Sequence, residues 1–249
     1  MRNWLFYAEA GNAALEQAVG ALENQGFRFV GEPSDDVTHL LLPVPCRLTT
    51  EALSATLSRL PSNITVIGGF LDRQELEEYA RTDLLQDAQY QAENAMITAY
   101  CALRVAEAQL PRIWSGCPVL VLGWGRIGKC LSRLLQGLGA QVSVAARKES
   151  DRAMCAALGY DARDIGDLGG FLRRYRVIFN TVPFPVLSRE QTDACRSDRI
   201  LVELASRPGM DADDVIDARG LPGKLAPESA GCLIARTIMR LCARKEMAL

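Results

Sequence analysis

Histidine is nearly absent from this chain of 249 residues, which contains only His39. With a single imidazole, we expect neither a histidine-based metal site nor a Ser-His-Asp triad. The 28 lysines and arginines are balanced by 30 aspartates and glutamates, which leaves a net charge of −2. A surface without excess positive charge is poorly suited to a nucleic acid backbone. The composition thus argues against metal-dependent and nucleic-acid-binding functions.

Long apolar runs are also missing. No stretch reaches the about 18 uninterrupted apolar residues that suggest a membrane-spanning helix. The apolar run near Met1 is short and is soon interrupted by Glu9, which does not fit a signal peptide. The eight cysteines include no C-x-x-C pair, a pattern typical of reduced thiols in a cytosolic protein. We therefore expect a cytoplasmic protein with no membrane partner.

Short apolar runs alternate with helical patterns in residues 1–92. The expected strands are Trp4–Ala8, Phe27–Val30, His39–Leu42 and Ile64–Ile67, and the expected helices are Ala13–Asn24 and Thr49–Leu60. Alternating strands and helices predict a parallel sheet with helices on its faces. Residues 1–92 are therefore predicted to form a small α/β lobe of flavodoxin-like type. Ala92–Ala108 contains neither proline nor glycine, and residues 93–111 are predicted to be a connecting helix.

A second series of strands follows in residues 112–230. These strands are predicted at Val119–Leu122, Gln141–Ala145, Val177–Thr181 and Ile200–Ala205, with a shorter candidate at Val215–Ala218. The helical pattern of Pro227–Arg244 is the last one, and we expect residues 231–249 to pack back on the first lobe. The predicted fold class is α/β: a Rossmann domain with a parallel sheet, and a smaller N-terminal α/β lobe joined to it by a long helix.

A glycine motif follows the first strand of this second region. Its residues are Gly123, Trp124, Gly125, Arg126, Ile127 and Gly128. The G-x-G-x-x-G pattern is weak by itself, but here a buried strand precedes it, the helix Lys129–Leu138 follows, and another strand comes next. The three glycines would allow a tight turn, a close approach of the pyrophosphate and close helix packing. The motif predicts a dinucleotide site; the alternative is a chance glycine-rich turn.

The residues after the second strand indicate which dinucleotide is bound. Sites for NAD usually place an acidic residue there, on the ribose 2′-hydroxyl. This chain has Arg147 and Lys148 instead, and no acid before Glu149. Because arginine can hold a phosphate through a bidentate contact, the pair favours NADP over NAD. A solvated charged loop is the alternative.

Further candidates follow the ends of other strands, where ligands of such sheets bind. Thr181, Val182, Pro183 and Ala205 are expected to border the cofactor, and Ser206, Arg207, Pro43 and Val44 the substrate. Arg207 would hold a carboxylate, unless it is a plain surface residue. Glu203 would face the cleft or end an ion pair, and Trp124 would shield the pyrophosphate or simply pack. His39 fits a structural residue better than a catalytic base.

Four strings in the second region carry a resemblance to a known family. They are Gly123–Gly128 with Ala145-Ala146-Arg147, Asn180-Thr181-Val182-Pro183, Leu204-Ala205-Ser206-Arg207-Pro208-Gly209, and the most specific one, 220–231, GLPGKLAPESAG. Together they resemble the family of the dipicolinate synthase A-subunit. The likeness runs roughly from Asn94 to Leu241 and is weaker in the first lobe, through Leu41–Pro45.

This resemblance implies a two-lobed fold like that of the 2-hydroxyacid dehydrogenases. It implies an NAD(P)-dependent oxidoreductase that converts a dihydrodipicolinate-type diacid into dipicolinate during spore formation; with the preference from Arg147 and Lys148, the expected cofactor is NADP. The implied partners are further copies of the chain and the flavoprotein-like B-subunit of dipicolinate synthase. Gly123, Gly125, Gly128 and Arg147 would hold the cofactor, and Asn94, Thr98, Ser206 and Arg207 would face the substrate.

The chain departs from the family pattern at two places. Where the family usually reads Asn-x-x-Pro-Thr-Ala-Glu-Gly, Tyr100 replaces the glutamate and Cys101 the glycine. The segment between Gly209 and Gly220 is also short. Two alternatives to the family's activity therefore stay open: a non-catalytic or repurposed NADP-binding protein of the same fold, and another NAD(P)-dependent dehydrogenase. The lone His39 disfavours the second.

Overall fold

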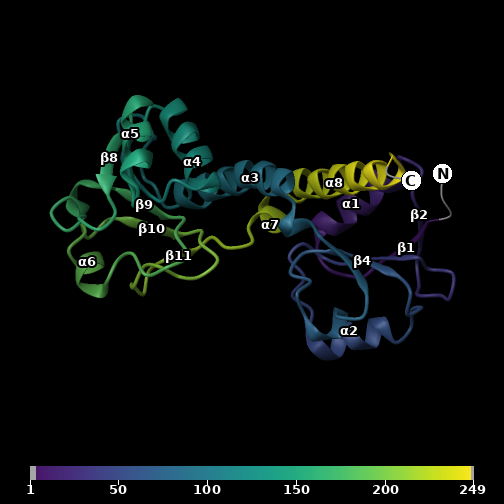
Figure 1. Ribbon diagram of the computed structural model, residues 1–249. Coiled ribbons are helices and arrows are strands. Elements are labelled where there is room, and N and C mark those ends of the chain that lie inside the picture. The colour runs from purple at the N-terminus through teal and green to yellow at the C-terminus, as the bar shows by residue number, and fades with distance from the viewer. Residues whose placement is uncertain (1–3, 248–249) are drawn as a thin grey trace. The chain divides into compact units, whose positions relative to one another are not determined.

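The structure is a computed structural model that describes residues 4–247, and its chain divides into two compact units (Figure 1). The first unit comprises Met1–Asn94 and Pro222–Leu249, and the second comprises Ala95–Leu221. The division falls within one long helix, α3 (Ala88–Glu107). Twenty residues without proline or glycine explain why this helix is uninterrupted.

The first unit is built around a five-stranded parallel sheet. The strands are β1 (Leu5–Ala8), β2 (Arg28–Val30), β3 (His39–Leu41), β4 (Thr65–Gly68) and β5 (Ala80–Asp83), in the order β2-β1-β3-β4-β5. This is the strand order of flavodoxin-like sheets. Helices α1 (Ala13–Glu23) and α2 (Thr50–Leu57) and the 3₁₀ turn η1 (Gln74–Leu76) lie between the strands, and the 3₁₀ turn η2 (Leu84–Gln86) leads from β5 into α3.

The C-terminal helix completes the first unit. After the short helix α7 (Pro222–Leu225), α8 (Pro227–Met247) packs along α1. Gly231 makes this packing close, because a Cβ at that position would lie 2.5 Å from the carbonyl oxygen of Ala14. Arg236 and Arg240 of α8 pair with Glu93 (2.8 Å) and Asp87 (2.6 Å). The end of the chain thus forms part of the first unit's fold.

The second unit contains a six-stranded parallel sheet. Its strands are β6 (Pro118–Leu122), β7 (Gln141–Ala146), β8 (Asp161–Asp164), β9 (Val177–Asn180), β10 (Ile200–Glu203) and β11 (Ile216–Asp217). The order β11-β10-β9-β6-β7-β8 is the Rossmann order, with β6 as the first strand. Helices α4 (Arg126–Gly137), α5 (Glu149–Ala157) and α6 (Arg189–Asp193) and the turn η3 (Leu172–Arg174) lie between the strands. The predicted fold class is confirmed.

Several element boundaries differ from the prediction. Helix α4 begins at Arg126 rather than Lys129, so that its first turn lies within the glycine motif. Strands β5 and β8 were not predicted, because their sequences, ARTD and DARD, lack an apolar run. Residues 222–230, predicted within the dinucleotide-binding domain, group with the first unit instead. Within residues 4–247, no helix is long and apolar enough to cross a membrane.

Candidate functional site

The turn between β6 and α4 is shaped by three glycines with different roles. Gly123 has a φ of 102°, and a Cβ there would lie 2.5 Å from Thr181 Oγ1. A Cβ at Gly128 would lie only 2.2 Å from the carbonyl oxygen of Gly123. Gly125 is exposed, and a Cβ there would meet nothing within 4 Å. The fold itself therefore requires Gly123 and Gly128, whereas Gly125 keeps the space outside the turn open.

Helix α4 begins without a side-chain cap. Gly125 is its N-cap residue, and the first turn contains no acidic residue. The first backbone N–H groups of a helix have no partner within the helix, and they carry a partial positive charge. Arg126 is exposed beside them, and Ile127 is half-buried. The 12-residue helix thus presents free donors to an anion next to the open space at Gly125.

Two exposed cations follow β7, the strand paired with β6. The side chains of Arg147 and Lys148 are exposed. Arg152 of α5 organises this loop, because its Nη1 donates to the carbonyl oxygens of Ala146 (3.1 Å) and Arg147 (2.7 Å). The same guanidinium pairs with Asp164 at 2.9 Å. The backbone that presents Arg147 is therefore held in place, while the Arg147 side chain points to solvent.

The side chain of Trp124, the second residue of the motif, packs against Tyr160 and Lys129. Its ring meets Tyr160 edge-on at 5.6 Å between centroids, and Lys129 Nζ lies 5.7 Å from the centre of the indole. These contacts are packing contacts between the turn, α4 and the segment before β8.

The loop after β9 joins the glycine turn directly. Both the backbone N–H and the hydroxyl of Thr181 donate to the carbonyl oxygen of Leu122, at 2.9 and 2.8 Å. Val182 is half-buried, and its N–H donates to Asn180 Oδ1 (2.9 Å). Pro183 is half-buried as well. Thr181 and Val182 therefore border Gly123, on the carboxyl side of the sheet.

A buried polar pair connects this loop to the next one. Asn180 is fully buried and Glu203 is 3% exposed. Asn180 Nδ2 donates to both carboxylate oxygens of Glu203, at 2.9 and 3.0 Å. Glu203 also accepts from the N–H groups of Ala205 (3.0 Å) and Gly209 (2.8 Å). Glu203 forms none of the ion pairs found in residues 4–247; instead, amide donors surround its carboxylate.

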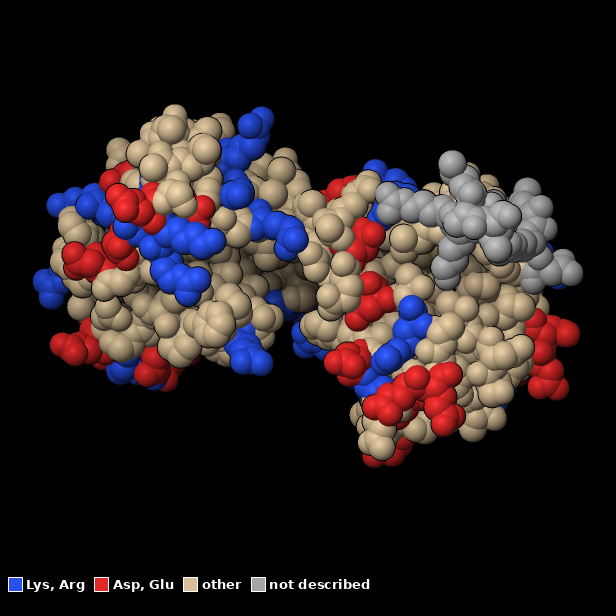
Figure 2. Space-filling model, in the orientation of Figure 1, with Lys and Arg blue, Asp and Glu red and all other residues tan. Residues whose placement is uncertain are grey.

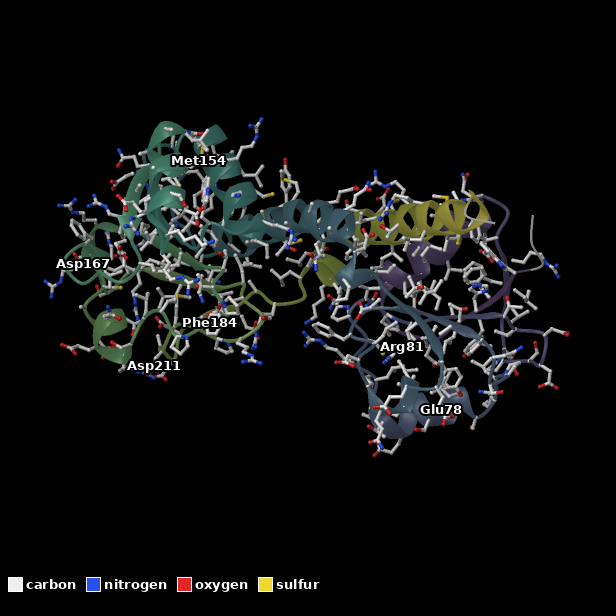
Figure 3. All side chains as sticks on the ribbon, viewed as in Figure 1. Glu78, Arg81, Met154, Asp167, Phe184 and Asp211 are labelled. Carbon is white, nitrogen blue, oxygen red and sulfur yellow. The ribbon has the colours of Figure 1, made fainter. Side chains whose placement is uncertain are left out.

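The substrate candidates of the second unit lie partly on the loop after β10. Ser206 and Arg207 are exposed, and Thr98 of α3 is buried. Phe184, on the loop after β9, is 65% exposed and is labelled in Figure 3. A Cβ at Gly209 would lie 2.4 Å from the carbonyl oxygen of Phe184, so the two loops touch. The sequence interpretation did not include Phe184 because a single phenylalanine in a loop carries no pattern.

The remaining candidates belong to the first unit. Pro43 is buried and Val44 half-buried, on the loop after β3. Val44 lies against the turn after β4, where a Cβ at Gly69 would approach its Cγ1 to 2.8 Å. Asn94 is half-buried on α3, one helical turn before Thr98. Pro43, Val44 and Asn94 are thus in one unit, and all the cofactor candidates are in the other.

The single histidine plays a structural role. The His39 ring stacks on Phe6 at 4.7 Å and is tilted against Trp4 at 5.2 Å. His39 Nδ1 is 2.8 Å from Thr38 Oγ1. These contacts place it inside the first sheet's packing, as the sequence interpretation preferred. In residues 4–247 no group of His, Cys, Asp or Glu side chains is arranged to hold a metal.

A cavity of about 400 Å³ lies away from these residues. It opens near the amino ends of β6, β7 and β8, where Pro118, Gln141 and Asp161 line it. Ligands of such sheets bind at the opposite, carboxyl ends. On the face drawn in Figure 2, acidic and basic side chains occur together on both units. We therefore place the candidate site at the glycine turn.

The fold is similar to the folds of several solved proteins. The two-unit α/β fold is that of Rossmann-type dehydrogenases: an L-alanine dehydrogenase has a TM-score of 0.70 and 10% identity, over 96% of this chain and 88% of that chain. The A-subunit of dipicolinate synthase from Bacillus halodurans has a TM-score of 0.83 and 22% identity, and the alignment covers 96% of this chain and 97% of that chain. No protein-family model matches the chain.

The sequence comparison points to the same family. Over 136 residues the chain is 30% identical to the A-subunit of dipicolinate synthase from Bacillus subtilis (strain 168). The matched stretch is 51% of this chain and 46% of the relative, so it spans about half of that protein's length. The predicted resemblance to the family of the dipicolinate synthase A-subunit is confirmed.

Proposed function

We propose that the chain binds a nicotinamide dinucleotide at the turn between β6 and α4 and catalyses a hydride transfer. The observation that carries this proposal is the combination of an uncapped α4 with open space at Gly125. A pyrophosphate placed there would accept hydrogen bonds from the first N–H groups of α4. Thr181, Val182 and Pro183 would border the nicotinamide end, and Ala205 lies on the neighbouring loop.

We propose NADP as the preferred dinucleotide. Arg147 and Lys148 are exposed after β7, where NAD sites usually place an acid on the ribose hydroxyls. The first acid, Glu149, already belongs to α5. The Arg147 guanidinium would hold the 2′-phosphate, and Arg152 would support it through the Arg147 carbonyl oxygen (2.7 Å). NAD remains the less favoured ligand.

The substrate proposed from the family resemblance is a dihydrodipicolinate-type diacid that is oxidised to dipicolinate. The bound nicotinamide would take up the hydride, and the proton that is lost with it would pass to solvent. Because the product ring gains aromaticity, the protein needs to supply little acid–base help. This fits a chain whose one imidazole, that of His39, is packed against Phe6. Arg207, exposed after β10, would hold one carboxylate of the substrate, with Ser206 beside it.

The proposed setting also follows the family. It comprises spore formation in the cytoplasm, the flavoprotein-like B-subunit of dipicolinate synthase as partner, and assembly with further copies of the chain. None of the eight cysteines, all of which lie within residues 4–247, forms a disulfide, which agrees with a reducing compartment. Together with Asn94 and Thr98 of α3, the residues Pro43 and Val44 of the first unit are proposed to contact the substrate.

A second candidate function is non-catalytic binding of the same dinucleotide. It is favoured by the two departures on α3, where Tyr100 is 55% exposed and Cys101 is fully buried. Buried Cys101 fills space that a glycine would leave open. If the family's glutamate serves the chemistry, its replacement by Tyr100 would leave binding intact and abolish turnover.

Calorimetric titration of the whole chain with NADP⁺ tests the binding proposal. Gly125→Val should lower the affinity at least about 100-fold, because the side chain would occupy the space of the pyrophosphate. Gly31→Val is a matched control, since a Cβ at Gly31 also meets nothing within 4 Å. Equal binding by both variants would remove Gly125 from the site.

Turnover separates the two candidate functions. The reaction mixture would contain the condensation product of pyruvate and aspartate semialdehyde, with and without the partner protein. Formation of dipicolinate with consumption of NADP⁺ would support the enzyme. Tight NADP⁺ binding without turnover under both conditions would support the non-catalytic alternative.

A further inference from the structure

Glu203 is the only charged side chain among the buried residues that the structure describes. It is 3% exposed and lies at the last position of β10, directly opposite Asn180 of β9 in the sheet register. Each of its oxygens accepts two contacts: one from Asn180 Nδ2 and one from a backbone N–H, that of Ala205 or Gly209. Such a set of donors offsets part of the large cost of burying a charge.

The geometry indicates that this group carries a negative charge. The groups that contact the Glu203 oxygens are all N–H donors, and none of them could accept a hydrogen bond from a carboxylic O–H. No cation forms an ion pair with the carboxylate within the described part of the chain. The pKa of Arg219 is raised, mainly by its hydrogen bond to Asp217. The charge of Glu203 makes a smaller contribution to this rise. The charge is therefore buried and incompletely balanced.

The pair also fixes the loops that border the proposed dinucleotide site. Two hydrogen bonds join Asn180 to the backbone of Val182. Asn180 Nδ2 donates to the Val182 carbonyl oxygen (3.0 Å), and the Val182 N–H donates to Asn180 Oδ1 (2.9 Å). Thr181 lies between Asn180 and Val182 in the sequence, and its hydroxyl donates to the carbonyl oxygen of Leu122, just before the glycine turn. On the other side, Glu203 holds Ala205 and Gly209, which enclose Ser206 and Arg207. The Glu203 carboxylate, together with Asn180, thus holds the backbone of the two loops that follow β9 and β10.

We propose that Glu203 is a positioning residue for the dinucleotide site and that its charge makes the site discriminate between oxidation states. The inference rests on the proposed function. The oxidised nicotinamide ring is a cation and the reduced ring is neutral, so a nearby buried anion stabilises the oxidised form selectively. Glu203 would act through the field and the loops, without touching the reacting atoms. It would favour binding of NADP⁺ relative to NADPH.

Three probes separate this role from a merely structural one: NADP⁺, NADPH, and 2′-phospho-ADP-ribose, which lacks the nicotinamide. Glu203→Gln keeps the shape and removes the charge, whereas Glu203→Asp keeps the charge. Asp161→Asn is the matched control, because Asp161 begins β8 at the opposite end of the same sheet and accepts from Ser143 (2.9 Å). Binding of each probe to each full-length protein is measured by calorimetry.

We expect Glu203→Gln to lower the affinity ratio of NADP⁺ over NADPH about fivefold. The affinity for 2′-phospho-ADP-ribose should stay within about twofold of wild type, and Glu203→Asp and Asp161→Asn should keep the wild-type ratio. Equal weakening of all three probes in Glu203→Gln would show a structural role only. An unchanged ratio would also overturn the proposal.

Two further outcomes are distinguishable. If the wild-type chain binds none of the three probes, the proposed function fails before Glu203 is tested. If Glu203→Gln does not fold by circular dichroism, Glu203→Ser takes its place, since its short side chain leaves room for water to satisfy the N–H donors. The expected shift of the affinity ratio is the same, and the same two results would overturn it.

Discussion

In both sheets, helices begin at the carboxyl ends of the strands. The N-termini of α1 and α2 in the first unit are capped differently from that of α4 in the second unit. In the first unit, Asn12 caps α1 by accepting from Leu15 N, and Thr49 caps α2 by accepting from Ala52 N (3.2 Å). Pro43 fills the space in front of Gly11, where a Cβ would lie 2.4 Å from its ring. In the second unit, α4 has no cap and Gly125 faces open space. The contrast supports placing the proposed anion site at α4, where the first N–H groups of the helix have no side-chain cap.

The strongest effect that this contrast predicts is on folding. Gly128→Ala should reduce the free energy of unfolding by about 3 kcal/mol, because the new Cβ would be forced against the Gly123 carbonyl oxygen. Gly137→Ala, in the same helix, meets nothing within 4 Å and should stabilise by up to about 1 kcal/mol. Urea denaturation measures both, and equal stability of the two variants would contradict the packing role of Gly128.

The next variant turns the open helix end into a capped one. Gly125→Asp should cap α4 and add a few tenths of a kcal/mol to its stability, as acids do at helix N-termini. The same carboxylate should repel the pyrophosphate and lower NADP⁺ affinity at least about 100-fold. Thermal unfolding and calorimetry would measure the two effects. Unchanged affinity in a capped α4 would mean that the dinucleotide binds elsewhere.

A smaller effect should follow from the cation after β7. Arg147→Asp should weaken NADP⁺ about 30-fold and NAD⁺ by less than about threefold, because only NADP⁺ carries the 2′-phosphate. Arg112→Asp, another exposed arginine of the second unit, serves as the control. Equal losses for both dinucleotides in Arg147→Asp would refute the phosphate contact.

The smallest expected effect concerns the N-cap of α1 in the first unit. Asn12→Ala removes the side-chain oxygen that accepts from Leu15 N at 3.0 Å. The first unit should lose about 1 kcal/mol of stability, which denaturant unfolding would detect, while NADP⁺ affinity stays unchanged. A loss of NADP⁺ affinity would show that the capped edge takes part in binding after all.

Much of this architecture could be predicted from the sequence, and the reasons are local. Strands β6 and β9 are buried apolar runs, and the glycine motif carries its spacing within six residues. Strands β5 and β8 escaped prediction because each lies at an edge of its sheet and is largely polar, so no apolar pattern marks it.

The polar pair beneath the site could not be predicted in the same way. Asn180 and Glu203 are 23 residues apart, and their contact depends on the register of β9 against β10. The same holds for Arg152, whose contact with the Arg147 carbonyl oxygen depends on where α5 begins. Each signal in the sequence is an ordinary polar residue, which becomes informative only once the strands and helices are placed.

The close packing of α8 against α1 has a consequence for the order of events during synthesis. Residues 95–221 form one continuous stretch, whereas the first unit needs two stretches separated by all of them. Because the chain emerges from the ribosome in order, the second unit can fold before α8 has been translated. Until Gly231 packs beside Ala14, the surface of α1 that α8 covers is exposed to solvent.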